Sequence, residues 1–117
     1  MTSVSRSMFA ACLLLALAAN AVADSLTVGS KTFTESHVLA EIAAQNLELG
    51  GFTVERKQGL GGTMVLWEAL QAGEIDVYPE YTGTLAQTIL RRPNADPIEL
   101  AAALAERDLE IVAELGF

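Results

Sequence analysis

The chain is poor in the side chains that build metal centres and disulfides. Its 117 residues include one cysteine, Cys12, and one histidine, His37. A structural zinc site needs several Cys or His ligands, and a disulfide needs two cysteines. The carboxylates are spread over several expected elements, as on a solvated surface: Glu35, Glu41, Glu48 and Glu55. We therefore expect no metal, no cofactor and no disulfide.

Basic residues are also scarce. Seven Lys and Arg stand against 15 Asp and Glu, which gives a net charge of −8 and a pI near 4.4. Proteins that bind nucleic acids rely on many basic contacts to phosphates, so this class is excluded.

Signals of catalysis are missing too. His37 is expected at an exposed or capping position in a helix that starts near Glu35. A triad of Ser30, His37 and Asp76 would lack the turn that presents a nucleophilic serine. The segment GLGGT lacks the ending of a phosphate-binding loop. We expect a protein that is not an enzyme.

Residues 1–23 have the pattern of a signal peptide. Arg6 precedes an apolar run from Met8 to Ala19, and the small residues after it end in Ala21, Val22 and Ala23. The run is shorter than the roughly 20 residues of a membrane span, which disfavours the alternative of an anchor. Cys12 lies early in the run, where a lipidated cysteine would not. We predict secretion and one small domain over residues 24–117.

The remaining sequence alternates strand and helix patterns. Such alternation predicts an α/β fold with a mostly parallel sheet, because parallel strands need helical crossovers. The expected strands cover residues 25–30, 52–57 and 74–81, and the expected helices follow at about 35–49, 63–73, 82–92 and 97–107.

Apolar spacing identifies the buried faces of two helices. Trp67 is expected in the core, and Gly50 with Gly51, then Gly73, are expected to end helices. In the first helix the recurring positions are Val38, Leu39, Ile42, Ala43, Asn46 and Leu47.

Three loops should meet at the carboxyl edge of this sheet, where ligands bind in such folds. They are GSKTFTES, GLGGTM and PEYTGT, each with Gly and Thr before a helix. Free backbone N–H groups and helix dipoles would make this an anion-binding edge, to which Lys31 adds a positive charge. The alternative for each threonine is simple helix capping.

The segment DVYPEYTGT contains both tyrosines of the chain. Tyr78 is expected in the core, whereas Tyr81 lies at the turn and is a ligand candidate. An aromatic face attracts cations, and quaternary ammonium groups are held in this way. One edge could therefore bind both charges of a zwitterion.

In order and spacing, these three motifs resemble the substrate-binding proteins of ABC importers for glycine betaine, carnitine and choline. The resemblance implies a type II periplasmic-binding-protein fold, whose two lobes close around the ligand. It implies that Tyr81 contacts the ammonium group of a quaternary amine and that Lys31 and Thr84 bind its carboxylate. Thr32, Gly62 and Thr63 are weaker candidates.

The resemblance also implies partners and a difference in length. A membrane permease would recognise the closed protein, and the acids Glu74, Asp76 and Glu80 are candidates for docking it. Family members are two or three times longer, so the second lobe is expected to be missing. A fragment of a longer frame, a degenerate gene and a split protein stay open as explanations.

Two alternative functions also stay open. The same edge could bind another small zwitterion or anion, such as an amino acid. The chain could also be a remnant that binds nothing.

Overall fold

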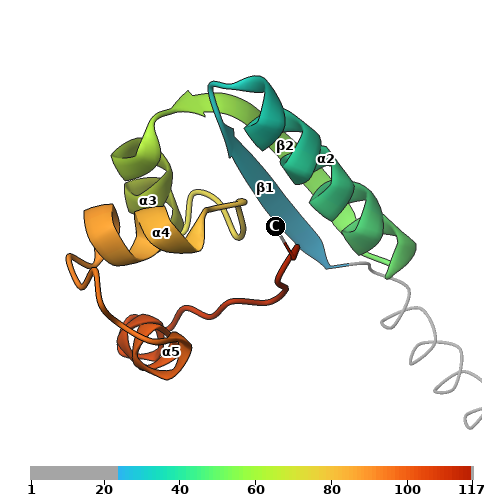
Figure 1. The fold of residues 1–117 in the computed structure, drawn as a ribbon. Coiled ribbons are helices and arrows are strands. Elements are labelled where there is room, and N and C mark those ends of the chain that lie inside the picture. Colours follow the sequence, from blue (N-terminus) through green and yellow to red (C-terminus); the bar gives the residue numbers. More distant parts are fainter. Residues whose placement is uncertain (1–23, 117) are drawn as a thin grey trace, which may run out of the picture.

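The computed structural model describes residues 24–116, and the predicted signal peptide lies outside this range. Strand and helix alternate as expected through the first two strand–helix units, and only helices follow (Figure 1). Within the described range, no helix has both the length and the hydropathy of a membrane span. The elements are β1 (Ser25–Lys31), α2 (Thr34–Leu49), β2 (Thr53–Gly61), α3 (Thr63–Gln71), the short α4 (Thr82–Thr84), a π-helical turn (Leu85–Ile89) and α5 (Pro97–Ala105).

Strand β1 is the centre of a small parallel sheet. It pairs with β2 from Ser25, opposite Thr53, to Gly29, opposite Lys57, and again at Lys31. On its other side, Val28 forms a parallel bridge with Val77. The sheet order therefore reverses at β1, and such a switch point is where open parallel sheets bind ligands.

The expected third strand is reduced to that one bridge. Thr27 donates its backbone N–H to the Asp76 carboxylate at 2.7 Å, so a side chain takes the place of a strand partner. The Gly29 N–H bonds the Val77 carbonyl at 2.9 Å, and Pro79 follows without an N–H to offer. Residues 74–81 thus lie beside β1 without forming a ladder.

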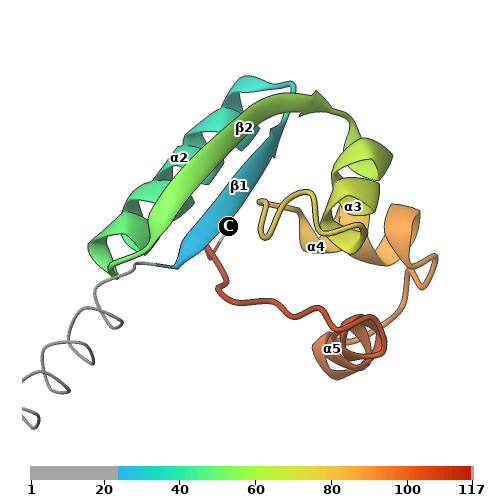
Figure 2. The same ribbon diagram turned by 180° about the vertical axis from the view of Figure 1, so that it is seen from behind.

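The two faces of the sheet are covered by different helices. Helix α2 lies on one side of the sheet, and α3 and α4 lie on the other (Figures 1 and 2). Val28 packs toward α2, whereas a Cβ on Gly29 would lie 2.9 Å from Ile75 Cδ1 on the opposite side. Three clusters form the core: Val28, Ala40 and Ala44; Leu66, Ala69 and Ile75; and Trp67, Leu85 and Leu104.

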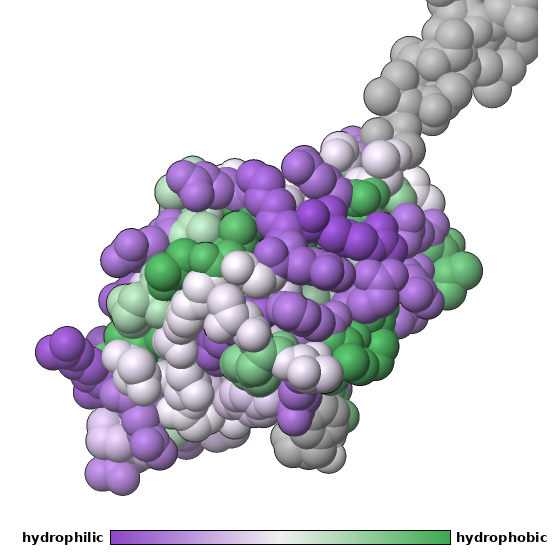
Figure 3. Space-filling view, turned by 90° about the horizontal axis from the view of Figure 1, so that it is seen from above, coloured by the Kyte–Doolittle hydropathy of each residue, from purple (hydrophilic) through white to green (hydrophobic). Residues whose placement is uncertain are grey.

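The buried face of α2 differs from the predicted one. Ser36, Ala40 and Ala44 are its buried residues, whereas Val38 and Ile42 are 52% and 48% exposed. Small side chains let the helix approach β1 closely, and this contact outweighs the burial of the larger residues. Hydrophobic patches accordingly interrupt a largely hydrophilic surface in Figure 3.

The predicted helix ends are confirmed for α2 and α3. Gly51 and Gly73 follow the last turns with φ of 96° and 76°, which suits glycine. After α3, the Glu74 N–H bonds the Ala69 carbonyl at 2.9 Å and the Gly73 N–H bonds the Leu70 carbonyl at 3.1 Å. This is the Schellman arrangement that stops a helix.

The third and fourth expected helices are altered or shortened. Residues 82–92 were expected to be one helix, but the α-helical turn passes into a π-helical turn and ends before Arg91, whose φ is 54°. Helix α5 begins at Pro97, as predicted, and ends two residues early. Trp67 is buried between α3, the π-helical turn and α5, so its expected core role is confirmed.

Candidate functional site

The three predicted loops meet at the Lys31 ammonium group, which contacts Thr63 and Glu80. Lys31 ends β1, Thr63 begins α3, and Glu80 follows the bridge to β1. The Lys31 Nζ donates to Glu80 Oε1 at 2.6 Å and to Thr63 Oγ1 at 3.0 Å. The expected convergence at the carboxyl edge of the sheet is therefore present, and a carboxylate of the chain itself fills it.

Glu80 has further donors from its own segment. Its Oε1 accepts from the Tyr81 backbone N–H at 3.0 Å, and its Oε2 accepts from the Tyr78 hydroxyl at 2.9 Å. The Lys31 and Glu80 side chains are only 6% and 12% exposed. Burial, together with the nearby Glu80 charge, raises the pKa of Tyr78, so its phenol keeps the proton that it donates.

The helices at this edge start without side-chain caps. The N-cap residues of α2, α3 and α4 are Phe33, Gly62 and Tyr81, and none of them accepts a hydrogen bond through its side chain. By contrast, Asp96 and Glu99 cap α5 reciprocally. The capping interpretation of the loop threonines is therefore wrong, and the amides at the edge are left for other partners.

Two aromatic rings lie at the solvent-exposed border of this edge, and we call the border with Phe33, Glu35, Glu80 and Tyr81 the rim. Phe33 and Tyr81 are stacked, with centroids 6.4 Å apart and an angle of 14° between their planes. The Tyr81 hydroxyl donates to the Glu35 carboxylate, and this bond is the main cause of the raised pKa of Tyr81. Both rings are partly open, at 41% and 37% exposure. Aromatic faces next to acids form a surface that attracts a cation.

The other predicted residues are placed less decisively. Thr84 is half-buried one turn after Tyr81, and no hydrogen bond of its side chain is found within residues 24–116. Thr32 is exposed. Gly62 has open space where a Cβ would be, so nothing in the fold demands a glycine there. Lys31 belongs to a strand, not to a loop as expected, and is 5% exposed.

Sequence reasoning missed the central residue. Glu80 looked like one surface acid among many, although its place between two tyrosines after a strand was a usable signal. In the first loop, Glu35 was also taken for a surface acid, and Phe33 was not recognised as a second aromatic residue of the site. Asp76 is also engaged internally, through Thr27.

His37 is half-buried, not exposed as expected. Its Nε2 is buried, with no hydrogen-bond partner in the described part of the chain. It would lie 3.7 Å from a Cβ built on Gly59, because α2 packs over the bulged end of β2. No group of His, Cys, Asp and Glu within residues 24–116 is arranged to hold a metal ion.

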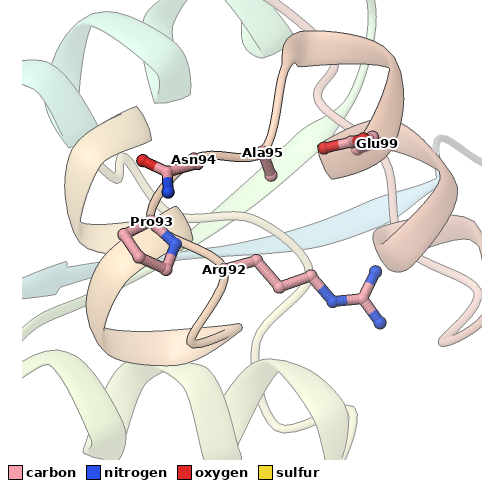
Figure 4. A pocket seen from close by; sticks show the side chains of 5 residues that line it. All are labelled: Arg92, Pro93, Asn94, Ala95 and Glu99. Carbon is pink, nitrogen blue, oxygen red and sulfur yellow. The ribbon is translucent and has the colours of Figure 1, made fainter.

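A shallow depression of about 490 Å³ lies away from this edge, in the loop before α5 (Figure 4). Its lining contains none of the predicted site residues. The Glu99 carboxylate in its wall already accepts from the Asp96 N–H at 3.1 Å. The depression is lined by Arg92, Pro93, Asn94, Ala95 and Glu99. We therefore place the candidate site at the rim around Glu80.

Several known proteins are similar to this chain. The chain is 40% identical over 84 residues to a glycine-betaine-binding protein of Pseudomonas aeruginosa, covering 72% of the chain. It is 46% identical over 61 residues to the glycine betaine-binding protein YehZ of Escherichia coli, covering 52%. It is 33% identical over 104 residues to an ergothioneine transport permease/ergothioneine binding protein, EgtU, of Helicobacter pylori, covering 84%.

The solved structure of apo YehZ from Escherichia coli matches with a TM-score of 0.53 and 38% identity, over 73% of this chain and 28% of that one. The expected periplasmic-binding-protein fold is thereby confirmed. The chain spans 27%, 20% and 19% of the three relatives. Residues 24–114 match the family described as the substrate binding domain of ABC-type glycine betaine transport systems. The chain therefore belongs to this family of substrate-binding domains.

Proposed function

We propose that residues 24–117 form a ligand-binding lobe of an extracytoplasmic solute-binding protein. It would serve an ABC importer of quaternary ammonium osmoprotectants of the glycine betaine or choline type. Residues 1–23 would direct secretion to the periplasm. Family membership supports this proposal, as do the names of the glycine betaine-binding relatives.

The observation that carries the proposal is the stacked pair of Phe33 and Tyr81 beside Glu35. A quaternary ammonium group has no N–H to donate, so ring faces and nearby acids are its natural partners. The polar end of the ligand would then point toward Lys31 and Thr84. Thr32, Gly62 and Thr63 would contribute at the margin of the site.

The exposure of the rings sets the expected affinity. Each ring face contributes about 0.5–1 kcal/mol to a cation that stays hydrated. A dissociation constant of about 1 mM corresponds to about 4 kcal/mol, so two open rings with a few polar contacts reach only this range. We expect millimolar binding by this chain, and tighter binding where a second surface covers the rings.

In a complete importer, closure around the ligand would create the surface that the permease recognises. Other subunits would hydrolyse ATP, and this lobe would bind without catalysing a reaction. Among the acids considered for docking, Glu74 is exposed and free to serve. Asp76 and Glu80 are already held within the lobe.

Nuclear magnetic resonance of the isotope-labelled chain tests the proposal. Glycine betaine and choline should shift the backbone resonances of Phe33, Tyr81 and Thr84 at millimolar concentrations. The control ligand is the neutral alcohol in which a tert-butyl group replaces the trimethylammonium of choline, and it should leave them unchanged. Replacing Tyr81 by Leu should weaken the response to both amines.

Three results would count against the proposal. Equal shifts with the neutral alcohol would show that the rings bind apolar groups and not cations. No shifts at all would favour a remnant without binding activity. Micromolar affinity by titration calorimetry would contradict the argument from ring exposure.

A second candidate ligand is ergothioneine, which also contains a trimethylammonium and a carboxylate group. The EgtU relative, whose name includes this solute, matches 84% of the chain. Including ergothioneine and an ordinary amino acid in the same titration separates the candidates. A response to the amino acid alone would favour a general zwitterion site over a quaternary ammonium site.

A further inference from the structure

We propose that Glu80 determines specificity at this rim and favours a quaternary ammonium ligand without a carboxylate, such as choline, over a zwitterion such as glycine betaine. The inference rests on the proposed function, because it concerns which ligand of that class the rim prefers. It comes from the arrangement around Lys31, where a carboxylate is already bound.

The first step is that Lys31 is occupied. An ammonium group has three N–H donors. One of them bonds Glu80 at 2.6 Å and another bonds Thr63 at 3.0 Å. With the Lys31 side chain only 6% exposed, little of its charge faces the rim. A ligand carboxylate could reach Lys31 only by displacing Glu80 or by sharing the ammonium with it.

The second step is that Glu80 is held in place. Besides Lys31, it accepts from the Tyr81 N–H at 3.0 Å and from the Tyr78 hydroxyl at 2.9 Å. Its side chain is 12% exposed. Moving it away would leave several donors without partners in a buried place, which is costly. The ligand carboxylate would have to replace all these bonds to compensate.

The third step is the balance of charge around the rim. Lys31 stands against two acids, Glu80 and Glu35, so the group is negative overall. A ligand carboxylate meets repulsion there, whereas an ammonium group is attracted. Choline and glycine betaine share the trimethylammonium, so its contacts with the rings cancel when the two are compared. The preference is then decided by the charged carboxylate of glycine betaine against the neutral hydroxyl of choline.

The test is the Glu80→Gln variant, which keeps the size of the side chain and removes its charge. The wild-type chain should bind choline about fivefold more tightly than glycine betaine by resonance titration. In Glu80→Gln, the neutral amide no longer balances the charge of Lys31, so a ligand carboxylate can pair with it. Glycine betaine should then gain about tenfold relative to choline.

Glu74→Gln is the matched control. It removes the same charge from an exposed side chain in the segment that leads to the bridge, so the ratio of the two affinities should stay at the wild-type value. A change of equal size in both variants would assign the effect to net charge, and it would overturn the role of Glu80.

The outcomes separate the inference from the proposed function. If neither amine shifts the Phe33 and Tyr81 resonances, the proposed function fails. If both bind and Glu80→Gln leaves their ratio unchanged, only this inference fails. If circular dichroism shows that Glu80→Gln does not fold, the ratio of the wild-type affinities for choline and glycine betaine tests the inference. Glycine betaine binding as tightly as choline would then overturn the inference.

Discussion

Two ion-pair networks in this small domain use the same chemistry in different surroundings. Beneath the rim, Lys31 and Glu80 form a pair whose side chains are 6% and 12% exposed. Between α2 and β2, Arg56 bonds Glu41 and Glu48 at 2.7 Å and 2.5 Å, and all three side chains are at least 31% exposed. The first network organises the candidate site, and the second fastens a helix to a strand.

The difference in burial changes what each network does for folding. A buried pair loses much hydration, and removing one partner strands the other charge. An exposed pair keeps its water, is screened by salt, and contributes little. We therefore expect substitutions in the rim network to act strongly and substitutions around Arg56 to act weakly.

The largest effect is expected for Lys31→Met. It leaves the Glu80 charge buried without its partner, so the free energy of unfolding should fall by about 3–5 kcal/mol. Urea unfolding followed by circular dichroism measures this loss. Adding Glu80→Gln to Lys31→Met should restore part of the stability, because the stranded charge is then gone. A double variant as unstable as the single one would show that Lys31 acts through packing alone.

A smaller effect is expected for Tyr78→Phe. The ring still packs beside Leu66 and Ile75, and only the hydroxyl bond to Glu80 is lost. The free energy of unfolding should fall by about 1.5–3 kcal/mol, as for one hydrogen bond to a charged group. Tyr81→Phe, which loses a bond at an exposed position, is the control and should cost less. Equal losses in both would contradict the ranking by burial.

Arg56→Gln should change stability least among the substitutions. Its effect should be less than a third of that of Lys31→Met, because the pairs with Glu41 and Glu48 are exposed. High salt should shrink the difference between wild type and Arg56→Gln further, while the Lys31→Met difference should persist. If the loss of unfolding free energy in Arg56→Gln did not depend on salt, the ion pairs of Arg56 would behave as buried pairs, against this prediction.

The smallest expected effect is a pH dependence of the stability difference between wild type and Arg56→Gln. Hydrogen bonds from Arg56, and then from Gln45, lower the pKa of Glu41 below its ordinary 4.5. Stability from a lowered pKa is fully present above the unfolded value and disappears as pH falls through the folded value. The gap between wild type and Arg56→Gln should therefore narrow from about pH 6 to about pH 3. If the difference in unfolding free energy did not change with pH, Arg56 would not be what lowers the pKa of Glu41.

Much of the fold could be predicted because local signals and the tertiary structure agree. Alternating strand and helix patterns gave the parallel sheet, and glycines such as Gly51 and Gly73 marked helix ends. The buried face of α2 could not be read in this way. Periodicity favours large apolar residues such as Val38, whereas close approach to β1 selected Ala40 and Ala44. The shortened third strand depended on Asp76, a side chain that replaces a backbone partner.

The candidate site was half predictable. Motif order placed Lys31, Thr63 and Tyr81 on one edge, where Lys31 bonds Thr63 and Glu80, and Glu80 accepts from the Tyr81 N–H. The pairing of Lys31 with Glu80 was missed because a sequence does not show which of many acids is buried. The ligand roles of Lys31, Tyr81 and Thr84 stay predictions until the titrations are made.

The position of Trp67 gives the protein a built-in optical reporter. It is the one tryptophan of the sequence and is buried where α3, the π-helical turn and α5 meet. Its emission should shift to longer wavelengths when α5 detaches and water reaches the indole. Because none of the rim side chains belongs to this cluster, fluorescence can follow the docking of α5 separately from events at the ligand rim.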